Sequence, residues 1–344
     1  MNGSSQQRFD VVGAEAISAI LANHRSEVVG LVRDAYLAHQ SGRTINPDSY
    51  FLTFPDKPTA RIIALPARLQ GDAADGKTDA AGIKWISSFP ENHQRGLVRA
   101  SAVVVLNDMA TGFPYACLEG SLISAARTAA SAVLAAELLH GGKRARAVAI
   151  VGAGPIAATH VEYLLGTGWD IGEFRVHDLA PERAEAFRDR LRARGQAAET
   201  ATTVADAARG ADVVLFATTA PQPYLDDPAL FTAEQTILHV SLRDLGVPVI
   251  LSAQNVVDDV EHCLKAKTSV HLAEQSTGNR RFIAGTIADL LTGRVAPDPG
   301  RTRVVSPFGL GVLDLAVARF VHAQAVADGR AVAIDGFFAP AGTP

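Results

Sequence analysis

The chain has 344 residues, of which 48% are hydrophobic and 20% are charged, and these values are typical of a globular protein. They exclude an intrinsically disordered or collagen-like chain, and the presence of only Cys117 and Cys263 excludes a disulfide scaffold. A formal net charge of −4 gives no support to nucleic-acid binding, which needs concentrated positive charge, so we expect a small molecule as partner.

The cysteine spacing fits neither a zinc site nor a redox pair, so we expect two buried thiols and no metal. The longest apolar run, residues 147–158, has 12 residues and is interrupted by glycines and a proline, whereas a membrane span needs roughly 20. The N-terminus has no basic segment followed by an apolar core. The sequence therefore predicts a cytoplasmic protein without a membrane partner.

The first third of the chain predicts a region of mixed α and β structure. Helical periodicity extends over residues 13–40, and extended segments follow at residues 49–54, 60–65, 82–89, 100–106 and 113–118. Residues 107–112 join the last two, and their Asn, Asp and Gly favour a hairpin turn. We expect an antiparallel sheet with helices beside it.

Strands and helices then alternate. An alanine-rich helix over residues 121–139, ended by Gly141 and Gly142, leads into this part. The expected strands are residues 147–151, 174–177, 213–217 and 236–241, and the expected helices are residues 155–165 and 181–194, with a short unit near 198–209. The pattern predicts an α/β fold with a doubly wound parallel sheet of Rossmann type.

Two domains follow from these patterns. Residues 1–125 form an α+β domain, and residues 126–309 form the Rossmann domain. The last helix, residues 312–327, is amphipathic, and we expect the segment 310–335 to return and complete the first domain. The tail over residues 337–344 is expected to be loose.

A dinucleotide fingerprint follows the strand at residues 147–151 and reads Gly152-Ala153-Gly154-Pro155-Ile156-Ala157. Gly152 permits the tight turn, Gly154 lets a pyrophosphate approach the backbone, and Ala157 lets helix and strand pack closely. The context of strand, turn and helix predicts a nucleotide site rather than a simple turn.

Asp178 ends the next strand, 24 positions after Gly154 (178 − 154), where a carboxylate is expected to bind the adenosine ribose. A carboxylate there favours NAD over NADP, although Arg183 nearby leaves NADP open, and Asp178 could also cap the following helix. The later strands end in Ala217-Thr218-Thr219 and in Ser241-Leu242-Arg243-Asp244. We expect these residues to border the nicotinamide, because carboxyl ends of parallel strands face the ligand.

Several charges lie in apolar surroundings. Arg127 is the single charge between Glu119 and Glu137 on a helix that is apolar nearly all round, so its guanidinium needs an anion, either a ligand carboxylate or an acid elsewhere in the chain. Lys84, Arg61 and Arg99 lie on or beside expected strands, where a solvated sheet face is the ordinary alternative. Asp244 is a candidate proton acceptor or a turn residue.

The chain resembles the ornithine cyclodeaminase/mu-crystallin family over nearly its whole length. The resemblance lies in Gly82-Ile83-Lys84, Phe89-Pro90-Glu91-Asn92, Gly96-Leu97, the segment LISAARTAA at residues 122–130, and the GxGxxA turn. Residues 241–244, 255–264 and 306–314 are most similar to the branch that makes 2,3-diaminopropionate.

The resemblance implies a homodimer whose first domain provides substrate binding and dimerisation. It implies that Asp244 is the catalytic acid and base, that Lys84 is the pocket lysine, and that Arg61 and Arg127 bind a carboxylate. It also assigns Phe308 and Gly309 to substrate binding. The chain departs from the cyclodeaminases at Leu242-Arg243, where they have two glycines, and at Arg99, where they have a small polar residue, which disfavours ornithine.

The branch implies a substrate with three carboxylates, N-(2-amino-2-carboxyethyl)-L-glutamate, which suits the cations Arg61, Arg99, Arg127, Arg243 and Lys84. NAD-dependent oxidative cleavage would give 2,3-diaminopropionate and 2-oxoglutarate for a siderophore or a nonribosomal peptide. The alternatives are an ornithine or lysine cyclodeaminase, a ketimine reductase or an alanine dehydrogenase of the same family, and a non-catalytic nucleotide-dependent binding protein like mu-crystallin. The joint presence of Lys84, Arg127 and Asp244 argues against a purely binding role.

Overall fold

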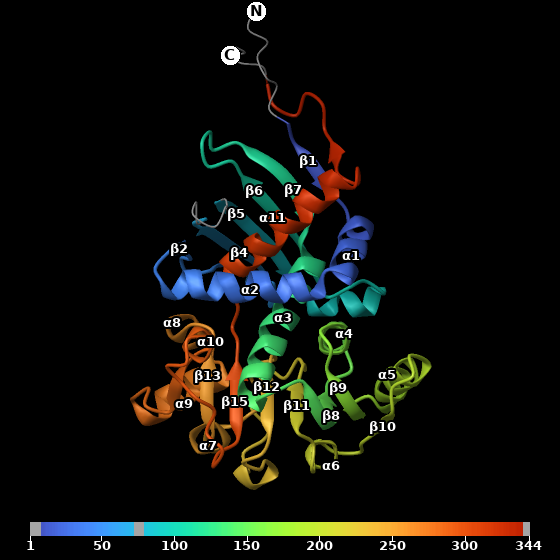
Figure 1. Ribbon diagram of the computed structural model, residues 1–344, viewed down its shortest axis with the longest axis vertical. Coiled ribbons are helices and arrows are strands. Elements are labelled where there is room, and N and C mark those ends of the chain that lie inside the picture. Colours follow the sequence, from blue (N-terminus) through green and yellow to red (C-terminus); the bar gives the residue numbers. More distant parts are fainter. Residues whose placement is uncertain (1–7, 72–78, 340–344) are drawn as a thin grey trace, which may run out of the picture. The chain divides into compact units, whose positions relative to one another are not determined.

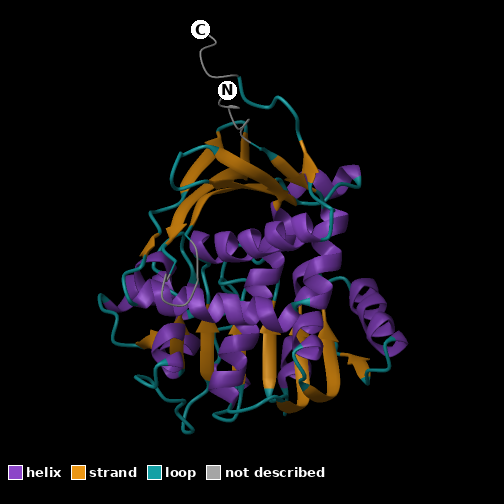
Figure 2. Ribbon diagram, turned by 45° about the horizontal axis from the view of Figure 1, so that its top comes forward, coloured by secondary structure: helices purple, strands orange, loops and turns teal. Residues whose placement is uncertain are grey.

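The computed structural model describes residues 8–71 and 79–339, apart from the side chain of His93. The chain divides into two compact units, Met1–Arg127 with Leu310–Pro344, and Thr128–Gly309. Each unit contains one eight-stranded sheet. Figures 1 and 2 show helices beside the strands in each unit. The long helix α3 (Gly120–His140) carries the chain from the first unit into the second.

The first unit is a mixed sheet with helices on one face. The sheet order is β16-β1-β7-β6-β5-β4-β2, with β3 paired to β4; β1 runs parallel to β7, and the other pairs are antiparallel. Helix α11 packs on β4, β5 and β6 and against α2. The elements are β1 (Asp10–Val12), α1 (Ala14–Asn23), α2 (Arg25–Gln40), β2 (Thr44–Ile45), β3 (Tyr50–Phe54), β4 (Lys57–Leu69), β5 (Ala80–Ser88), η2 (Pro90–Arg95), β6 (Ala100–Asn107), β7 (Pro114–Glu119), α11 (Gly311–Ala327) and β16 (Val332–Ala333).

Most local predictions for this unit are confirmed, with two corrections. The hairpin between β6 and β7 is present, closed by the Asp108 amide donating to the Phe113 carbonyl. The helical stretch over residues 13–40 is two helices, because the chain leaves helical geometry at His24. The prediction of a loose tail is wrong for its first residues: Phe337 stacks on Phe9, and Phe338 meets Phe113 edge to face; residues 340–344 lie outside the described residues.

Helix α3 ends where the paired glycines predicted, at Gly141, which has a φ of +81°. By length and composition alone this helix could cross a membrane, a test that the sequence analysis did not expect any segment to pass. However, 67% of its most apolar window is buried inside the structure, as in the core helix of a soluble protein.

The second unit has the predicted Rossmann-type arrangement. All strand pairs are parallel, in the order β10-β9-β8-β11-β12-β15-β13-β14, and helices alternate with the strands. The elements are β8 (Arg144–Val151), α4 (Pro155–Gly166), β9 (Asp170–His177), α5 (Pro181–Ala193), β10 (Ala198–Thr200), α6 (Val204–Ala208), β11 (Val213–Phe216), η3 (Pro228–Leu230), β12 (Thr236–His239), α7 (Val247–Ser252), β13 (Gln254–Val257), α8 (Val260–Cys263), α9 (Ser269–Thr277), β14 (Ile283–Thr286), α10 (Ile287–Leu291) and β15 (Arg303–Ser306).

Strand β12 ends at His239, two residues before the predicted boundary. Residues 241–244 form a turn instead, in which Leu242 has a φ of +68°, a conformation that is unusual for a residue with a branched side chain. The turn contains Ser241 and Asp244, two of the predicted site residues.

Candidate active site

The carboxyl ends of the parallel strands in the second unit bring together the residues predicted for the cofactor. Asp178 follows β9, Gly152 follows β8, Thr218 follows β11 and Ser241 follows β12, and these four strands are neighbours in the sheet. Since all of them run in the same direction, their ends lie along one edge, which is where α/β sheets bind ligands.

The glycine-rich turn has the geometry that a bound phosphate requires. Gly152 has a φ of +96°, and a Cβ atom there would lie 2.7 Å from the Ala217 carbonyl oxygen, so the sheet itself requires glycine. A Cβ atom on Gly154 would meet nothing within 4 Å, which leaves open space beside the backbone. Helix α4 begins next to it with Gly154 as N-cap and no side-chain cap, and Ala157 is fully buried. The residues therefore fit the pyrophosphate of a dinucleotide.

Asp178 links the turn to the end of the neighbouring strand. One of its carboxylate oxygens accepts a hydrogen bond from the Ala153 amide at 2.8 Å, and the other accepts one from the Ala180 amide at 2.9 Å. Helix α5 begins after Ala180 and has no side-chain cap, so Asp178 does not cap this helix. The carboxylate keeps free lone pairs that could accept the hydroxyl groups of a ribose.

Asp244 is fully buried and is surrounded by hydroxyl groups. Its Oδ1 accepts hydrogen bonds from Thr218 and, at 3.1 Å, from the Tyr224 phenol, and its Oδ2 accepts one from Ser241. Its backbone amide donates to His239 Nε2 at 3.1 Å. Burial favours a raised pKa, but the hydrogen bond and charge of His239, whose Nε2 lies 3.4 Å from Oδ2, and the hydrogen bonds from Ser241 and Thr218 outweigh it, so the pKa of Asp244 lies below its ordinary value.

Lys84 lies in a buried charged cluster in the first unit. Its Nζ is 2.6 Å from Asp314 Oδ2 and donates to Ser124 Oγ at 3.1 Å, while Arg127 Nε is 3.2 Å from Asp314 Oδ1. Lys84 and Arg127 are 2% and 8% exposed, and Asp314 is fully buried. Arg127 therefore meets an acid of the chain, as one of the two interpretations predicted.

Burial and the Arg127 charge lower the pKa of Lys84 and the Asp314 carboxylate raises it, with burial the largest effect, so that the pKa of Lys84 falls to about 8. The pKa of Asp314 is lowered, because the two cations outweigh the effect of its burial. Asp314 is thus ionised at neutral pH.

Arg61 and Arg99 form a second cationic pair. Arg61 lies opposite Ser88 in the pairing of β4 with β5, and Arg99 Nη1 donates to Ser88 Oγ at 2.8 Å. Partial burial and the charge of Arg61 lower the pKa of Arg99. Arg61 Nε is buried and has no hydrogen-bond partner, and no acid within residues 8–71 or 79–339 forms an ion pair with either arginine.

The remaining predicted substrate residues have their polar groups in use within the chain. Arg243 donates to the Ala266 carbonyl at 2.7 Å. The amides of Phe308 and Gly309 donate to the Asp258 carboxylate at 2.9 and 2.5 Å, so neither amide is available to a substrate in this conformation. Among the predicted cofactor residues, Thr219 is exposed, and Leu242 lies in the turn before Asp244.

Sequence reasoning missed Asp314, Ser124, Tyr224 and His239. Asp314 had a signal of the kind that identified Arg127, because it is the single acid in the apolar helix α11. The partners of Asp244 carried no such signal: Tyr224 comes from a loop without periodicity, and His239 from the buried end of a strand.

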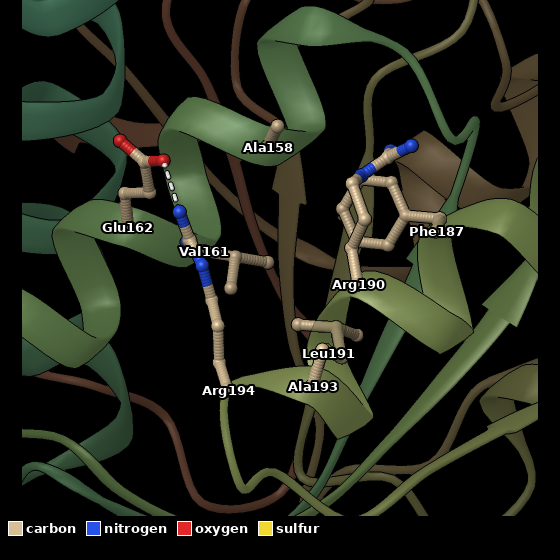
Figure 3. A pocket seen from close by; sticks show the side chains of 8 residues that line it. All are labelled: Ala158, Val161, Glu162, Phe187, Arg190, Leu191, Ala193 and Arg194. Carbon is tan, nitrogen blue, oxygen red and sulfur yellow. Dashed lines mark hydrogen bonds and ion pairs between the residues drawn. The ribbon is translucent and has the colours of Figure 1, made fainter.

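A separate groove of about 330 Å³ lies between α4 and α5 (Figure 3). Arg194 and Glu162 form an ion pair across it at 3.2 Å, and the guanidinium of Arg190 lies over the ring of Phe187 at 5.1 Å. None of the predicted site residues lines the groove.

Comparison with known proteins identifies a family. The model of the ornithine cyclodeaminase/mu-crystallin family matches residues 14–329. N-((2S)-2-amino-2-carboxyethyl)-L-glutamate dehydrogenase of Staphylococcus aureus is 30% identical over 316 residues, which cover 88% of this chain and 91% of that protein. Alanine dehydrogenase of Archaeoglobus fulgidus is 28% identical over 310 residues, which cover 87% of this chain and 90% of that protein.

The fold has a close counterpart among solved structures. Delta(1)-pyrroline-2-carboxylate reductase of Thermococcus litoralis, solved in complex with NADH and L-proline, matches with a TM-score of 0.86 and 23% identity over 95% of this chain and all of that one. The relatives thus share the architecture, while their substrates differ.

Proposed function

Because the chain belongs to the ornithine cyclodeaminase/mu-crystallin family, we propose that it is an NAD-dependent oxidoreductase that acts on a carbon–nitrogen bond of an amino acid. Its proposed substrate is N-(2-amino-2-carboxyethyl)-L-glutamate, and its products are 2,3-diaminopropionate and 2-oxoglutarate. The relative with 30% identity carries the name of this activity, whereas the alanine dehydrogenase at 28% shows that the fold also serves smaller substrates.

One observation supports the choice of substrate: the first unit gathers four cations, of which Lys84 and Arg127 are buried, Arg61 is half-buried and Arg99 is exposed. Asp314 pairs with both Lys84 and Arg127, and no ion pair of the described residues involves Arg61 or Arg99. Cations at two places on the sheet suit a substrate that carries several carboxylates. Desolvated guanidinium groups are costly unless anions meet them, so these cations support a polyanionic ligand.

The register of the sheet supports a single elongated ligand. Lys84 pairs with Leu65 and Ser88 pairs with Arg61, so Lys84 and Arg61 lie on the same face of neighbouring strands. Four residues along a strand separate these positions by about 13 Å between Cα atoms, and the long side chains can shorten that separation. Alanine or ornithine, with one carboxylate, would leave the Arg61 and Arg99 pair without an anion.

In the proposed reaction, bound NAD would supply the acceptor for a hydride that leaves the glutamate Cα. Asp244 takes the proton of the secondary amine, so that a carbon–nitrogen double bond forms, then returns this proton to the nitrogen and accepts one from the water that adds to the carbon. The carbon–nitrogen single bond of the adduct then breaks: Asp244 gives its proton to the leaving nitrogen and accepts the proton of the adduct's hydroxyl group, so that 2-oxoglutarate and 2,3-diaminopropionate separate and one proton is finally released to solvent. Lys84 and the arginines hold the carboxylates throughout.

The residues at the nucleotide turn support NAD as the cofactor. Asp178 would accept the ribose hydroxyls, and its negative charge would repel the 2′-phosphate of NADP. Gly152, Ala153, Gly154, Pro155 and Ile156 would hold the pyrophosphate, and Ala217, Thr218, Thr219, Ser241 and Leu242 would border the nicotinamide. A binding protein without catalysis needs no buried carboxylate with three hydroxyl donors, so Asp244 favours the enzyme over that alternative.

Three further features complete the proposal. We propose a cytoplasmic location, a homodimer, and a supply of 2,3-diaminopropionate to a siderophore or a nonribosomal peptide pathway. The domain assignment, with residues 1–125 and 310–335 binding substrate and residues 126–309 binding NAD, agrees with the two compact units of the chain.

Arg99→Gln tests the substrate assignment. Loss of one charged hydrogen-bonding partner should lower kcat/KM for the tricarboxylate about tenfold or more, chiefly through KM. The control is Arg33→Gln, because Arg33 is an exposed arginine on α2 that pairs with its neighbour Asp34. Equal kcat/KM values for the Arg99 variant and the wild type would remove the second carboxylate site from the proposal.

A further inference from the structure

Asp314 contacts two residues of the proposed site, Lys84 and Arg127, but the proposed reaction gives it no role. It lies in the first turn of α11, fully buried, and its two oxygens face different cations, Lys84 at 2.6 Å and Arg127 at 3.2 Å. A buried carboxylate is costly, and here the cations and the helix N-terminus compensate for that cost. The arrangement fixes the positions of both cations.

Asp244 and Asp314, both 0% exposed, have different environments. Asp314 faces a lysine and an arginine and is therefore ionised, while Asp244 faces the hydroxyl groups of Thr218, Tyr224 and Ser241 and, at 3.4 Å, His239 Nε2. No lysine or arginine among the residues of the structure's described ranges forms an ion pair with Asp244. Asp244 can therefore accept a proton without breaking an ion pair with a lysine or arginine, whereas Asp314, between two such cations, cannot.

We propose that Asp314 is a positioning residue that keeps Lys84 protonated at neutral pH, so that Lys84 acts as the cation and Asp244 as the proton acceptor. This division of roles rests on the proposed function, which uses both residues but does not itself decide between them. Without Asp314, the buried Lys84 would lie beside Arg127 alone and would lose its proton.

The charged groups around Lys84 are few, which makes its titration interpretable. Asp314 on α11 and Arg127 on α3 are the charges that act on it, and Ser124 on α3 gives it a neutral hydrogen-bond partner. On the flanking strands its register partners are Leu65 and Val104, which carry no charge. Removal of Asp314 should lower the pKa of Lys84, and removal of Arg127 should raise it.

The experiment is an NMR titration of the full chain labelled with ¹³C at lysine Cε, which needs no substrate. The sequence has six lysines, so the spectrum is simple, and Lys84→Arg assigns the Lys84 signal by removing it. We expect Lys84 to titrate near the pKa of about 8 in the wild type. In Asp314→Asn the midpoint should fall by about one unit or more, and in Ser124→Ala it should change by less than about half a unit.

Arg127→Leu should raise the titration midpoint of Lys84, the opposite of the change expected for Asp314→Asn. This variant keeps the test possible if Asp314→Asn does not fold. The proposal is overturned if Lys84 of the wild type loses its proton below pH 7, or if neither variant moves the midpoint. Since no substrate is present, failure of the proposed substrate in a turnover assay leaves this outcome unaffected, and the two failures are distinguishable.

Discussion

At the scale of single residues, the site depends on how each buried charge is compensated. Asp314 is compensated by cations from positions 230 and 187 residues away, and no local pattern can reveal such pairings. What the sequence does reveal is that a lone charge in an apolar helix needs a partner. That reasoning selected Arg127; α11 carries Asp314 as its single acid but also Arg319, so the signal there is weaker, and the structure brings Arg127 and Asp314 together.

The hydroxyl groups around Asp244 lead to a prediction for Thr218→Val. The variant removes one donor that stabilises the ionised carboxylate, so the pKa of Asp244 should rise. The base must be ionised to accept a proton, and the low-pH limb of kcat/KM should therefore move to higher pH, by about one unit.

The matched control is Thr167→Val, because the Thr167 hydroxyl donates only to carbonyl groups of its own helix. A pH profile of Thr218→Val that coincides with those of the control and the wild type would show that Asp244 is not the titrating base.

At the scale of elements, long and periodic segments were predictable, and short buried ones were not. The hairpin of β6 and β7, helix α3 and the alternation from β8 to β12 follow from periodicity and turn residues. Strands β13 and β15 have four residues each, and all of them are buried, so neither shows an alternation of apolar and polar residues. For that reason residues 245–309 carry no predicted element.

The glycine-rich turn yields a prediction that separates folding from binding. Gly152→Ala should lower the free energy of unfolding by about 1–3 kcal/mol, because the new Cβ would lie 2.7 Å from the Ala217 carbonyl oxygen at a φ of +96°. Gly154→Ala meets no atom within 4 Å, so it should keep the stability of the wild type and lose affinity for NAD.

Urea unfolding and calorimetric NAD titration measure the two effects. Wild-type NAD affinity in Gly154→Ala would place the pyrophosphate elsewhere and would contradict the assignment of this turn.

At the scale of the whole molecule, helices cover one face of the first unit's sheet, and the described residues place exposed apolar side chains on the other face. Lys84 and Val104 are buried on the helix-covered face, so their neighbours Trp85 and Val103 lie on the other face, where Trp85 is 42% exposed. Trp85 pairs with Ala64 on β4, and Ala64 pairs with Tyr50 on β3, so these side chains form a row across the sheet that ends at Tyr50, which is 72% exposed. An apolar row across four strands is typical of a protein interface.

We therefore expect this face to form the proposed homodimer, and Trp85→Glu should weaken it, because a desolvated charge would lie in the interface. Light scattering after size exclusion should give about twice 36.1 kDa for the wild type and a mass closer to 36.1 kDa for the variant. Leu251→Glu on α7 is the control, since this exposed leucine belongs to the second unit. A dimeric Trp85→Glu protein would place the interface elsewhere.

The central claim is the reaction, and one assay tests it most directly. The purified chain is incubated with NAD and N-(2-amino-2-carboxyethyl)-L-glutamate, with ornithine and alanine in parallel, and NADH and the carbon products are measured. The account predicts equal amounts of NADH, 2-oxoglutarate and 2,3-diaminopropionate from the first substrate. Proline and ammonia from ornithine without accumulation of NADH, together with no turnover of the tricarboxylate, would contradict it.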